Sequence, residues 1–186
     1  MLYGGSFDPI HNGHLALARN IQAKFDCDVK VIPVKNPFKD AGLFPLEERI
    51  AITKKAFEFC PRIEVVDWSL TWEKMESTYE CVRQFKEKNP GEHQIYVVMG
   101  SDALSKLAKW DQVEKLVKEI KLLIVQRPGY GCDDSIAKNL GFDVELMSAV
   151  GEVSSSTIRK KDVPWRTHVP GNVWNLVKGR LDEPKK

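Results

Sequence analysis

Long apolar runs, an excess of charge of one sign and paired cysteines are all missing from this 186-residue chain. No apolar run approaches the roughly 20 residues that a membrane-spanning helix needs. The 28 Lys and Arg nearly balance the 26 Asp and Glu, and the net charge of +2 gives no reason to expect a basic surface for nucleic acid. We therefore expect no membrane partner and no nucleic acid partner.

The cysteines are few and scattered, without a CxxC pair: Cys27, Cys60, Cys81 and Cys132. Such spacing is typical of reduced, structural thiols and excludes a zinc site or a disulfide framework built on close cysteine pairs. No cluster of Asp, Glu, His or Cys has metal-ligand spacing, so we predict no metal site in the protein itself. We expect no signal peptide, and the protein is predicted to be cytoplasmic.

Internal repeats, low-complexity tracts and linkers are also absent, and the length suits one domain, residues 1–186, with a frayed tail at 182–186. A short apolar run at Leu2 and Tyr3 starts the chain. Further strands are predicted at 28–34, 63–68, 93–99, 121–126 and 144–147. Helices are predicted at 15–25, 45–59, 78–87, 103–108, 112–120, 154–161 and 172–181. This alternation predicts an α/β fold: a single Rossmann-like domain with a parallel sheet and helices on both faces.

The first fifteen residues hold the most informative stretch. Gly4 and Gly5 are expected to break the short first strand, and Asp8-Pro9 extends the turn. A helix then starts near two imidazoles, His11 and His14, which share a face if both lie in its first turn. Backbone N–H groups at such a turn are a ready site for an anion.

A second stretch, Gly151 to Lys161, places four consecutive hydroxyls before Arg159. Hydroxyls and a guanidinium together can donate to one phosphate. Other unusual segments follow the ends of predicted strands: Lys35 to Lys39, Gly100-Ser101-Asp102, and Arg127-Pro128-Gly129. Because ligands bind at the carboxyl ends of parallel strands, all of these segments are expected at one binding edge.

The segment Gly-Ser-Phe-Asp-Pro at residues 5–9, followed by His11-Asn12-Gly13-His14, resembles the signature of the HxGH nucleotidyltransferase superfamily. Within it, the chain is most similar to the nicotinate/nicotinamide mononucleotide adenylyltransferases. The resemblance implies transfer of AMP from ATP to a pyridine mononucleotide, giving a dinucleotide and pyrophosphate. Its implied partners are ATP and that mononucleotide, and its implied cofactor is Mg²⁺ carried by the ATP phosphates.

The same resemblance assigns roles around ATP. The second signature, Ile-Ser-Ser-Thr-x-Ile-Arg, aligns on Ile158-Arg159 and puts Val153 in place of Ile and Ser156 in place of Thr. Implied catalytic residues are His14, His11, Lys39 and Arg159, with Lys35 as the competitor of Lys39. Implied nucleotide-binding residues are Gly5, Ser6, Phe7, His11, His14, Gly100, Asp102, Ser154, Ser155, Ser156 and Arg159.

On the acceptor side, Gly-Ser-Asp-Ala-Leu at 100–104 and Trp110 resemble the segment that distinguishes this family. A carboxylate can bind ribose hydroxyls and an indole can stack on a pyridine ring. Implied substrate-binding residues are Thr78, Asp102, Trp110 and Arg127. Trp72 and Tyr79 are alternatives for a second aromatic contact.

Two rival functions stay open at this point. One is another enzyme of the superfamily, a pantetheine-phosphate adenylyltransferase or a cytidylyltransferase. The other is a catalytically silent nucleotide-binding protein on the same fold. Nicotinate and nicotinamide are also both open as the ring, and a homo-oligomer is one alternative for the assembly.

Overall fold

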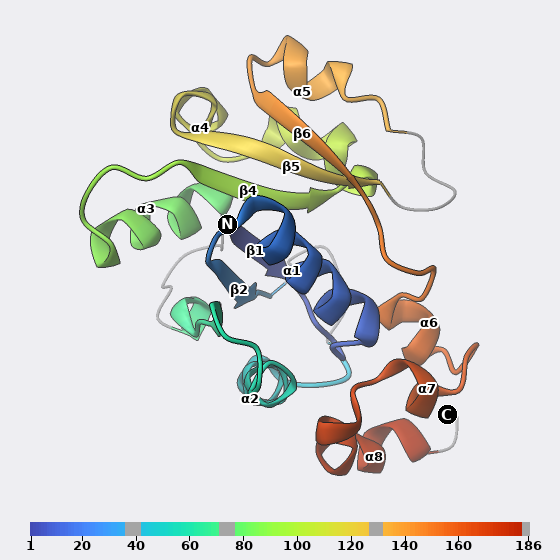
Figure 1. Cartoon of the computed structure of the whole chain (residues 1–186). Coiled ribbons are helices and arrows are strands. Elements are labelled where there is room, and N and C mark those ends of the chain that lie inside the picture. Colours follow the sequence, from blue (N-terminus) through green and yellow to red (C-terminus); the bar gives the residue numbers. More distant parts are fainter. Residues whose placement is uncertain (36–41, 71–76, 127–131, 184–186) are drawn as a thin grey trace.

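Six parallel strands form one sheet in the order β3-β2-β1-β4-β5-β6 (Figure 1). The computed structural model describes residues 1–35, 42–70, 77–126 and 132–183. In chain order the strands are β1 (Leu2–Gly5), β2 (Val29–Pro33), β3 (Ile63–Val65), β4 (Ile95–Gly100), β5 (Ile120–Gln126) and β6 (Asp143–Ser148). The predicted parallel α/β fold is confirmed.

Each central strand buries side chains on both faces of the sheet. In β5, Leu122 and Ile124 belong to one hydrophobic cluster, whereas Leu123 and Val125 belong to the other. All four are at most 4% exposed. Because neighbouring side chains of a strand point to opposite faces, this pattern requires a helical layer on each side.

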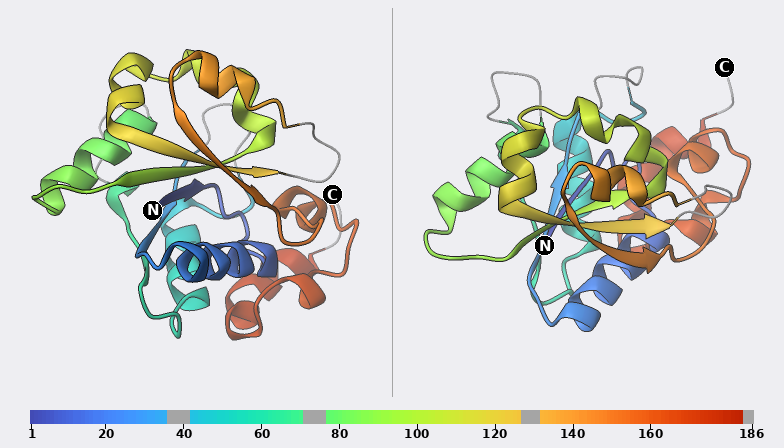
Figure 2. Two further views of the ribbon diagram at one scale, coloured as in Figure 1. Left: turned by 45° about the horizontal axis from the view of Figure 1, so that its top comes forward. Right: turned by 90° about the horizontal axis from the view of Figure 1, so that it is seen from above.

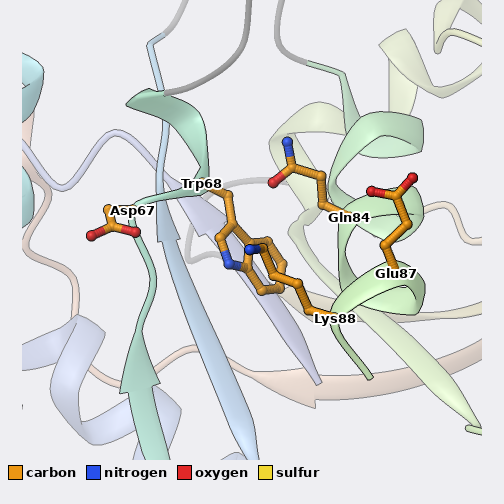
Figure 3. A pocket seen from close by; sticks show the side chains of 5 residues that line it. All are labelled: Asp67, Trp68, Gln84, Glu87 and Lys88. Atoms are coloured by element: carbon orange, nitrogen blue, oxygen red, sulfur yellow. The ribbon is translucent and has the colours of Figure 1, made fainter. Parts of the chain in front are cut away.

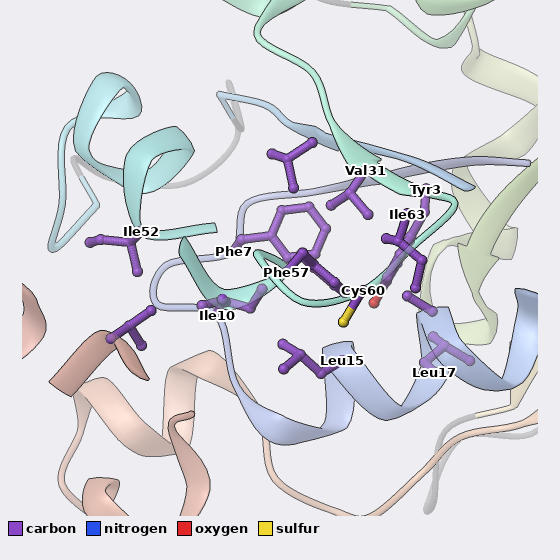
Figure 4. Packing of buried hydrophobic residues seen from close by; sticks show 14 of the residues in the cluster. Tyr3, Phe7, Ile10, Leu15, Leu17, Val31, Ile52, Phe57, Cys60 and Ile63 are labelled. Atoms are coloured by element: carbon purple, nitrogen blue, oxygen red, sulfur yellow. The ribbon is translucent and has the colours of Figure 1, made fainter. Parts of the chain in front are cut away.

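The two layers are built by helices from different parts of the chain (Figures 1 and 2). The α-helices are α1 (Asn12–Phe25), α2 (Leu46–Ala56), α3 (Thr78–Lys88), α4 (Val113–Glu119), α5 (Ser135–Asn139), α6 (Ser155–Arg159), α7 (Trp165–His168) and α8 (Trp174–Asp182). Buried side chains of α1, α2, α6, α7 and α8 share one cluster, and those of α3, α4 and α5 share the other. Figure 4 shows the first cluster, where Leu15 of α1 and Ile52 of α2 lie around Phe7.

Three short 3₁₀ segments complete the described elements: η1 (Trp68–Leu70), η2 (Ser101–Lys109) and η3 (Gly171–Val173). The helix predicted at 103–108 is confirmed within η2, and its type is 3₁₀. The strand predicted at 63–68 is too long, since β3 ends at Val65 and Trp68 already belongs to η1.

The two glycines of the first strand behave differently from the prediction. Gly4 and Gly5 do not break β1 but form its last two residues, in register with Ile32 and Pro33 of β2. The Val34 N–H also donates to the Gly5 carbonyl at 2.9 Å. Pairing with β2 on one side holds these glycines in the sheet in spite of their weak strand propensity.

The chain after α6 packs back on the N-terminal half. The Asn12 side chain donates to the Thr167 carbonyl at 3.3 Å, and the Asn172 side chain donates to the Lys55 carbonyl at 2.6 Å. Asp182 was expected in a frayed tail, but it ends α8 and accepts from the Trp165 indole at 2.9 Å. In the described part of the chain, no helix has the length and apolar character to span a membrane.

Two glycines test how the backbone conformation sets stability. Gly179 lies exposed in α8 with open space where a Cβ would be, so Gly179→Ala should raise the free energy of unfolding by about 1 kcal/mol. Gly141 has φ +95° and a Cβ there would lie 3.1 Å from Val117. Gly141→Ala should therefore lower stability, by more than about 1 kcal/mol. Urea unfolding of both variants checks the opposite signs; equal signs would contradict this assignment of the two conformations.

Candidate active site

The sheet provides a binding edge where β1 and β4 end side by side. β1 leads through α1 to β2 on one side, whereas β4 leads to β5 on the other. The connections therefore diverge between β1 and β4, and at such a point open α/β sheets generally bind ligands in a crevice outside the carboxyl ends of the strands. Gly5 and Gly100 are the last residues of the two strands, so the segments that follow them border this crevice.

The turn after β1 is shaped by Phe7. Its backbone has φ +44°, and its side chain is only 2% exposed. The ring lies over Gly5, where a Cβ would be 2.9 Å from the ring, and it meets the rings of Tyr3 and His14 edge-on at 5.3 and 4.9 Å. The buried Phe7 side chain thus supports the turn and the His14 ring.

The two histidines lie together at the start of α1. His11 is the N-cap and is 6% exposed, and His14 is the third residue of the helix. Their rings stack with centroids 3.6 Å apart and planes 28° apart. The backbone N–H of His11 donates to the ring atom Nδ1 of His14 at 3.3 Å, so a neutral His14 carries its proton on Nε2. His14 can therefore donate through Nε2 to a bound anion.

The glycine between the histidines has a steric cause. A Cβ on Gly13 would lie 3.0 Å from His11 Nδ1 and 3.0 Å from the Val150 carbonyl oxygen. The segment that leads to the serine-rich stretch therefore passes against the first turn of α1. Only glycine leaves room for this approach without a shift of the backbone.

The serine-rich stretch, about 150 residues later, binds the turn after β1. The Ser155 hydroxyl donates to the Pro9 carbonyl at 2.9 Å, and Arg159 Nη1 donates to the Asp8 carbonyl at 2.5 Å. Arg159 Nη2 donates to the Ser156 hydroxyl at 3.2 Å. The structure thus brings the two predicted motifs together beside the histidines.

Ser154 has a different role from its neighbours. It is the N-cap of α6, where its hydroxyl accepts from the Thr157 N–H at 3.2 Å. Thr157 returns a bond, since its hydroxyl accepts from the Ser154 N–H at 3.1 Å. This reciprocal cap fixes the start of the helix, so the Ser154 hydroxyl has a structural role as the N-cap of α6.

The predicted acceptor residues that the structure describes come from two segments, the start of α3 before β4 and η2 after it. Asp102 is exposed near the start of η2, and Trp110 follows the end of η2 with its side chain partly packed on the core. The Ser77 hydroxyl donates to Asp111 at 3.2 Å, which joins the start of α3 to the residue after Trp110. Thr78, the first residue of α3, therefore lies on a segment tied to that of Trp110.

Three predicted residues lie outside the described part of the chain. Lys39 and Arg127 are two of them, and Trp72, one alternative for the second aromatic, is the third. Across residues 1–35, 42–70, 77–126 and 132–183, no three His, Cys, Asp or Glu side chains are grouped to hold a metal ion.

The residues of the site fall within a stretch that matches a known protein family. Residues 2–161 match the cytidylyltransferase-like family, a stretch that includes both histidines and Arg159. A protein of Bacteroides fragilis (strain YCH46) named "Probable nicotinate-nucleotide adenylyltransferase" is 33% identical over 177 residues, which cover 90% of this chain and 86% of that protein. The chain belongs to the nicotinate-nucleotide adenylyltransferases of this family. The resemblance drawn from the sequence is confirmed.

Other members of the family agree over nearly the full length. A protein of the same name from Aliarcobacter butzleri (strain RM4018) is 29% identical, over 96% of this chain and 97% of its own length. Among solved structures, Plasmodium falciparum nicotinic acid mononucleotide adenylyltransferase complexed with NaAD has a TM-score of 0.77 at 23% identity. The matched residues cover 96% of this chain and 93% of the Plasmodium falciparum chain, so the two proteins share the fold over nearly their full length.

Sequence reasoning missed two buried charged residues at the edge, Asp8 and Arg49, which are 4% and 7% exposed. The Asp8 carboxylate accepts from the N–H groups of Leu43 and Phe44 at 2.8 and 3.0 Å, and it lies 3.7 Å from the Arg159 guanidinium. Asp8 was interpreted as a turn residue and as part of the signature at residues 5–9, without a role for its carboxylate. Arg49 could have been found as a charged residue on the apolar face of its predicted helix.

A surface pocket of about 400 Å³ lies elsewhere, between the end of β3 and α3 (Figure 3). Its lining residues are Asp67, Trp68, Gln84, Glu87 and Lys88, none of which was predicted as a site residue. The Lys54 ammonium, 2.9 Å from Asp67, holds the pKa of that carboxyl below its usual value. The pocket adjoins the carboxyl end of α3, whereas Thr78 is the first residue of that helix.

Gly13→Ala tests whether the close approach at α1 maintains the site. Alanine gains about 1 kcal/mol of helix propensity over glycine, but relief of a 3.0 Å contact with a backbone oxygen costs about 1–3 kcal/mol. We expect a net loss of stability and at least a tenfold loss of kcat/KM in the adenylyltransferase assay described below. Gly179→Ala is the matched control, with no loss of activity. Wild-type kcat/KM in Gly13→Ala would contradict the steric role.

Proposed function

We propose that this protein transfers AMP from ATP to nicotinate mononucleotide and releases pyrophosphate, a step that forms the NAD-type dinucleotide. The observation that carries the proposal is the meeting of His11, His14 and Arg159 around one turn, at the crevice between β1 and β4. The names of the two relatives, both nicotinate-nucleotide adenylyltransferases, favour nicotinate over nicotinamide as the ring.

The chemistry needs positioning and charge stabilisation more than a nucleophile on the enzyme. An oxygen of the acceptor phosphate attacks the α-phosphorus of ATP in line, and the bond from that phosphorus to the bridging oxygen of pyrophosphate breaks. The AMP group is joined directly to the acceptor, without an enzyme-bound intermediate. The pyrophosphate leaves with the electron pair of the broken bond.

His14 stabilises the charge that develops on the α-phosphate. Its Nδ1 accepts from the backbone N–H of His11, so Nε2–H is the ring group that we propose as donor to a phosphate oxygen. Stacking on His11 and the edge contact with Phe7 fix the ring plane, so the donor needs little reorganisation. His11 orients His14 and supports the phosphates.

Cations and hydroxyls around the β- and γ-phosphates complete this half of the site. Arg159 and Ser155 are hydrogen-bonded to the turn after β1, and Arg159 is bonded to the Ser156 hydroxyl. Lys39 is proposed to close over the leaving pyrophosphate. Mg²⁺ enters as part of the Mg–ATP substrate, bound mainly by the phosphates and water.

The acceptor is proposed to occupy the other side of the crevice. Asp102 would hold ribose hydroxyls, and Trp110 would stack on the pyridine ring. Thr78 and Arg127 would contact the ring or its phosphate. The bond from Ser77 to Asp111 keeps the segments of Thr78 and Trp110 together, which supports their use in one subsite.

The acceptor can be identified by pyrophosphate release with purified protein and Mg–ATP. Nicotinate mononucleotide, nicotinamide mononucleotide and 4′-phosphopantetheine are compared as acceptors. We expect turnover with the pyridine nucleotides and the highest kcat/KM with nicotinate mononucleotide. Turnover with phosphopantetheine alone would favour another enzyme of the superfamily, and ATP binding without turnover would favour a silent nucleotide-binding protein.

His14→Ala tests the proposed donor. Loss of one such donor typically lowers the rate by about 10²–10³-fold, so we expect kcat to fall by this factor with a much smaller change in the KM for ATP. His14→Gln, which keeps an N–H donor, should recover part of the rate. The exposed His93, on the connection before β4, supplies the control His93→Ala with wild-type kcat. An unchanged kcat in His14→Ala would exclude the role.

A further inference from the structure

Arg49 is a charged residue on a buried helix face. It lies in the first turns of α2, whose other buried residues include Leu46, Ile50 and Thr53, and it is itself 7% exposed. A buried guanidinium is costly unless hydrogen bonds satisfy its donors. The partners of Arg49 therefore show what the residue does there.

Its donors reach three carbonyl oxygens on three segments. Nη1 donates to Ser6 at 2.6 Å and to Val34 at 2.7 Å. Nε donates to Phe44 at 3.1 Å. Ser6 follows β1, Val34 follows β2, and Phe44 precedes α2, so one side chain ties together the backbone of all three segments.

Each of these segments adjoins part of the phosphate side of the site. Ser6 precedes Phe7, whose ring supports His14. Val34 and Phe44 lie on either side of the segment that carries Lys39. The Asp8 carboxylate binds the second of these two flanking positions, since it accepts from the N–H groups of Leu43 and Phe44.

We propose that Arg49 is a positioning residue for the transfer reaction, which sets the turn that carries the histidines relative to the two ends of the Lys39 segment. The proposal rests on the proposed function. Arg49 lies beneath the backbone of the turn and acts only through these carbonyl groups. The guanidinium is suited to this role because its planar fork places donors on two separate atoms, Nε and Nη1. The three N–H donors of a lysine ammonium all lie on one atom, which cannot occupy both positions.

The test compares Arg49→Lys, which keeps the charge, and Arg49→Met, which keeps an unbranched stem without charge. Arg19→Lys is the matched control, because Arg19 donates two N–H groups to Cys60 Sγ at 3.4 and 3.2 Å, at the opposite edge of the sheet. Kinetics are measured well below the melting temperature of every variant. Misplacement of catalytic groups by about 1 Å can cost about 10²-fold in rate, and we expect kcat to fall by this order in both Arg49 variants. The KM for the pyridine nucleotide should change less than the kcat, and Arg19→Lys should keep wild-type kcat.

Hydrogen exchange gives a readout that does not depend on activity. The amides of Val34, Leu43 and Phe44 are bonded at this junction, so their exchange should become faster in the Arg49 variants and stay unchanged in Arg19→Lys. Wild-type kcat and wild-type exchange in a folded Arg49 variant would overturn the proposal. Failure of both variants to fold would also overturn it, because Arg49 would then serve the fold alone.

The two proposals fail in distinguishable ways. If the wild-type protein shows no turnover with either pyridine nucleotide, the proposed function fails. The positioning role is then measured by exchange and by affinity for α,β-methylene-ATP. Unchanged affinity and exchange in the Arg49 variants would overturn it in that case as well.

Discussion

The contact between α6 and the turn after β1 is the interaction on which the site depends. Arg159 donates to the Asp8 carbonyl and Ser155 donates to the Pro9 carbonyl, across separations of 151 and 146 residues. These bonds place the hydroxyls and the guanidinium beside the stacked histidines, where neither motif would lie by its own local structure. Gly13 permits the contact, since any larger residue would meet the Val150 carbonyl that leads into it. The junction that closes the fold is therefore also the place where we propose that ATP binds.

Burial of charge at this edge follows from the same constraint. Asp8 and Arg49 carry opposite charges, but they stabilise the junction through backbone groups, one as an acceptor of N–H and the other as a donor to C=O. The three backbone segments that Arg49 contacts lie outside helices and strands, so the pairing of a regular element does not satisfy all of their polar groups. Buried side chains of fixed geometry satisfy those groups and hold these segments in place, and we propose that this preorganises the donors for the α-phosphate.

The sequence predicted the parallel sheet because strands alternate with helices along the chain, a signal that is local to each element. The phosphate roles of the two motifs were implied by the family resemblance, whereas their contact depends on bonds between residues about 150 positions apart. The helices α5 and α7 were not predicted, since five and four residues are too few to show a helical period. Gly4 and Gly5 were assigned to a turn because propensity alone disfavours them in a strand, whereas pairing with β2 decides their conformation. The roles of Asp8 and Arg49 depend on partners up to 151 residues away and are visible only in the folded chain.

The most direct measurement is a crystal structure with α,β-methylene-ATP, whose α–β bridge cannot be broken. We predict the α-phosphate within hydrogen-bond reach of His14 Nε2, with the β- and γ-phosphates toward Arg159, at the crevice between β1 and β4. Nucleotide in the pocket lined by Asp67 and Trp68, or a triphosphate away from both histidines, would contradict the central claim that the junction of the two motifs is the ATP site.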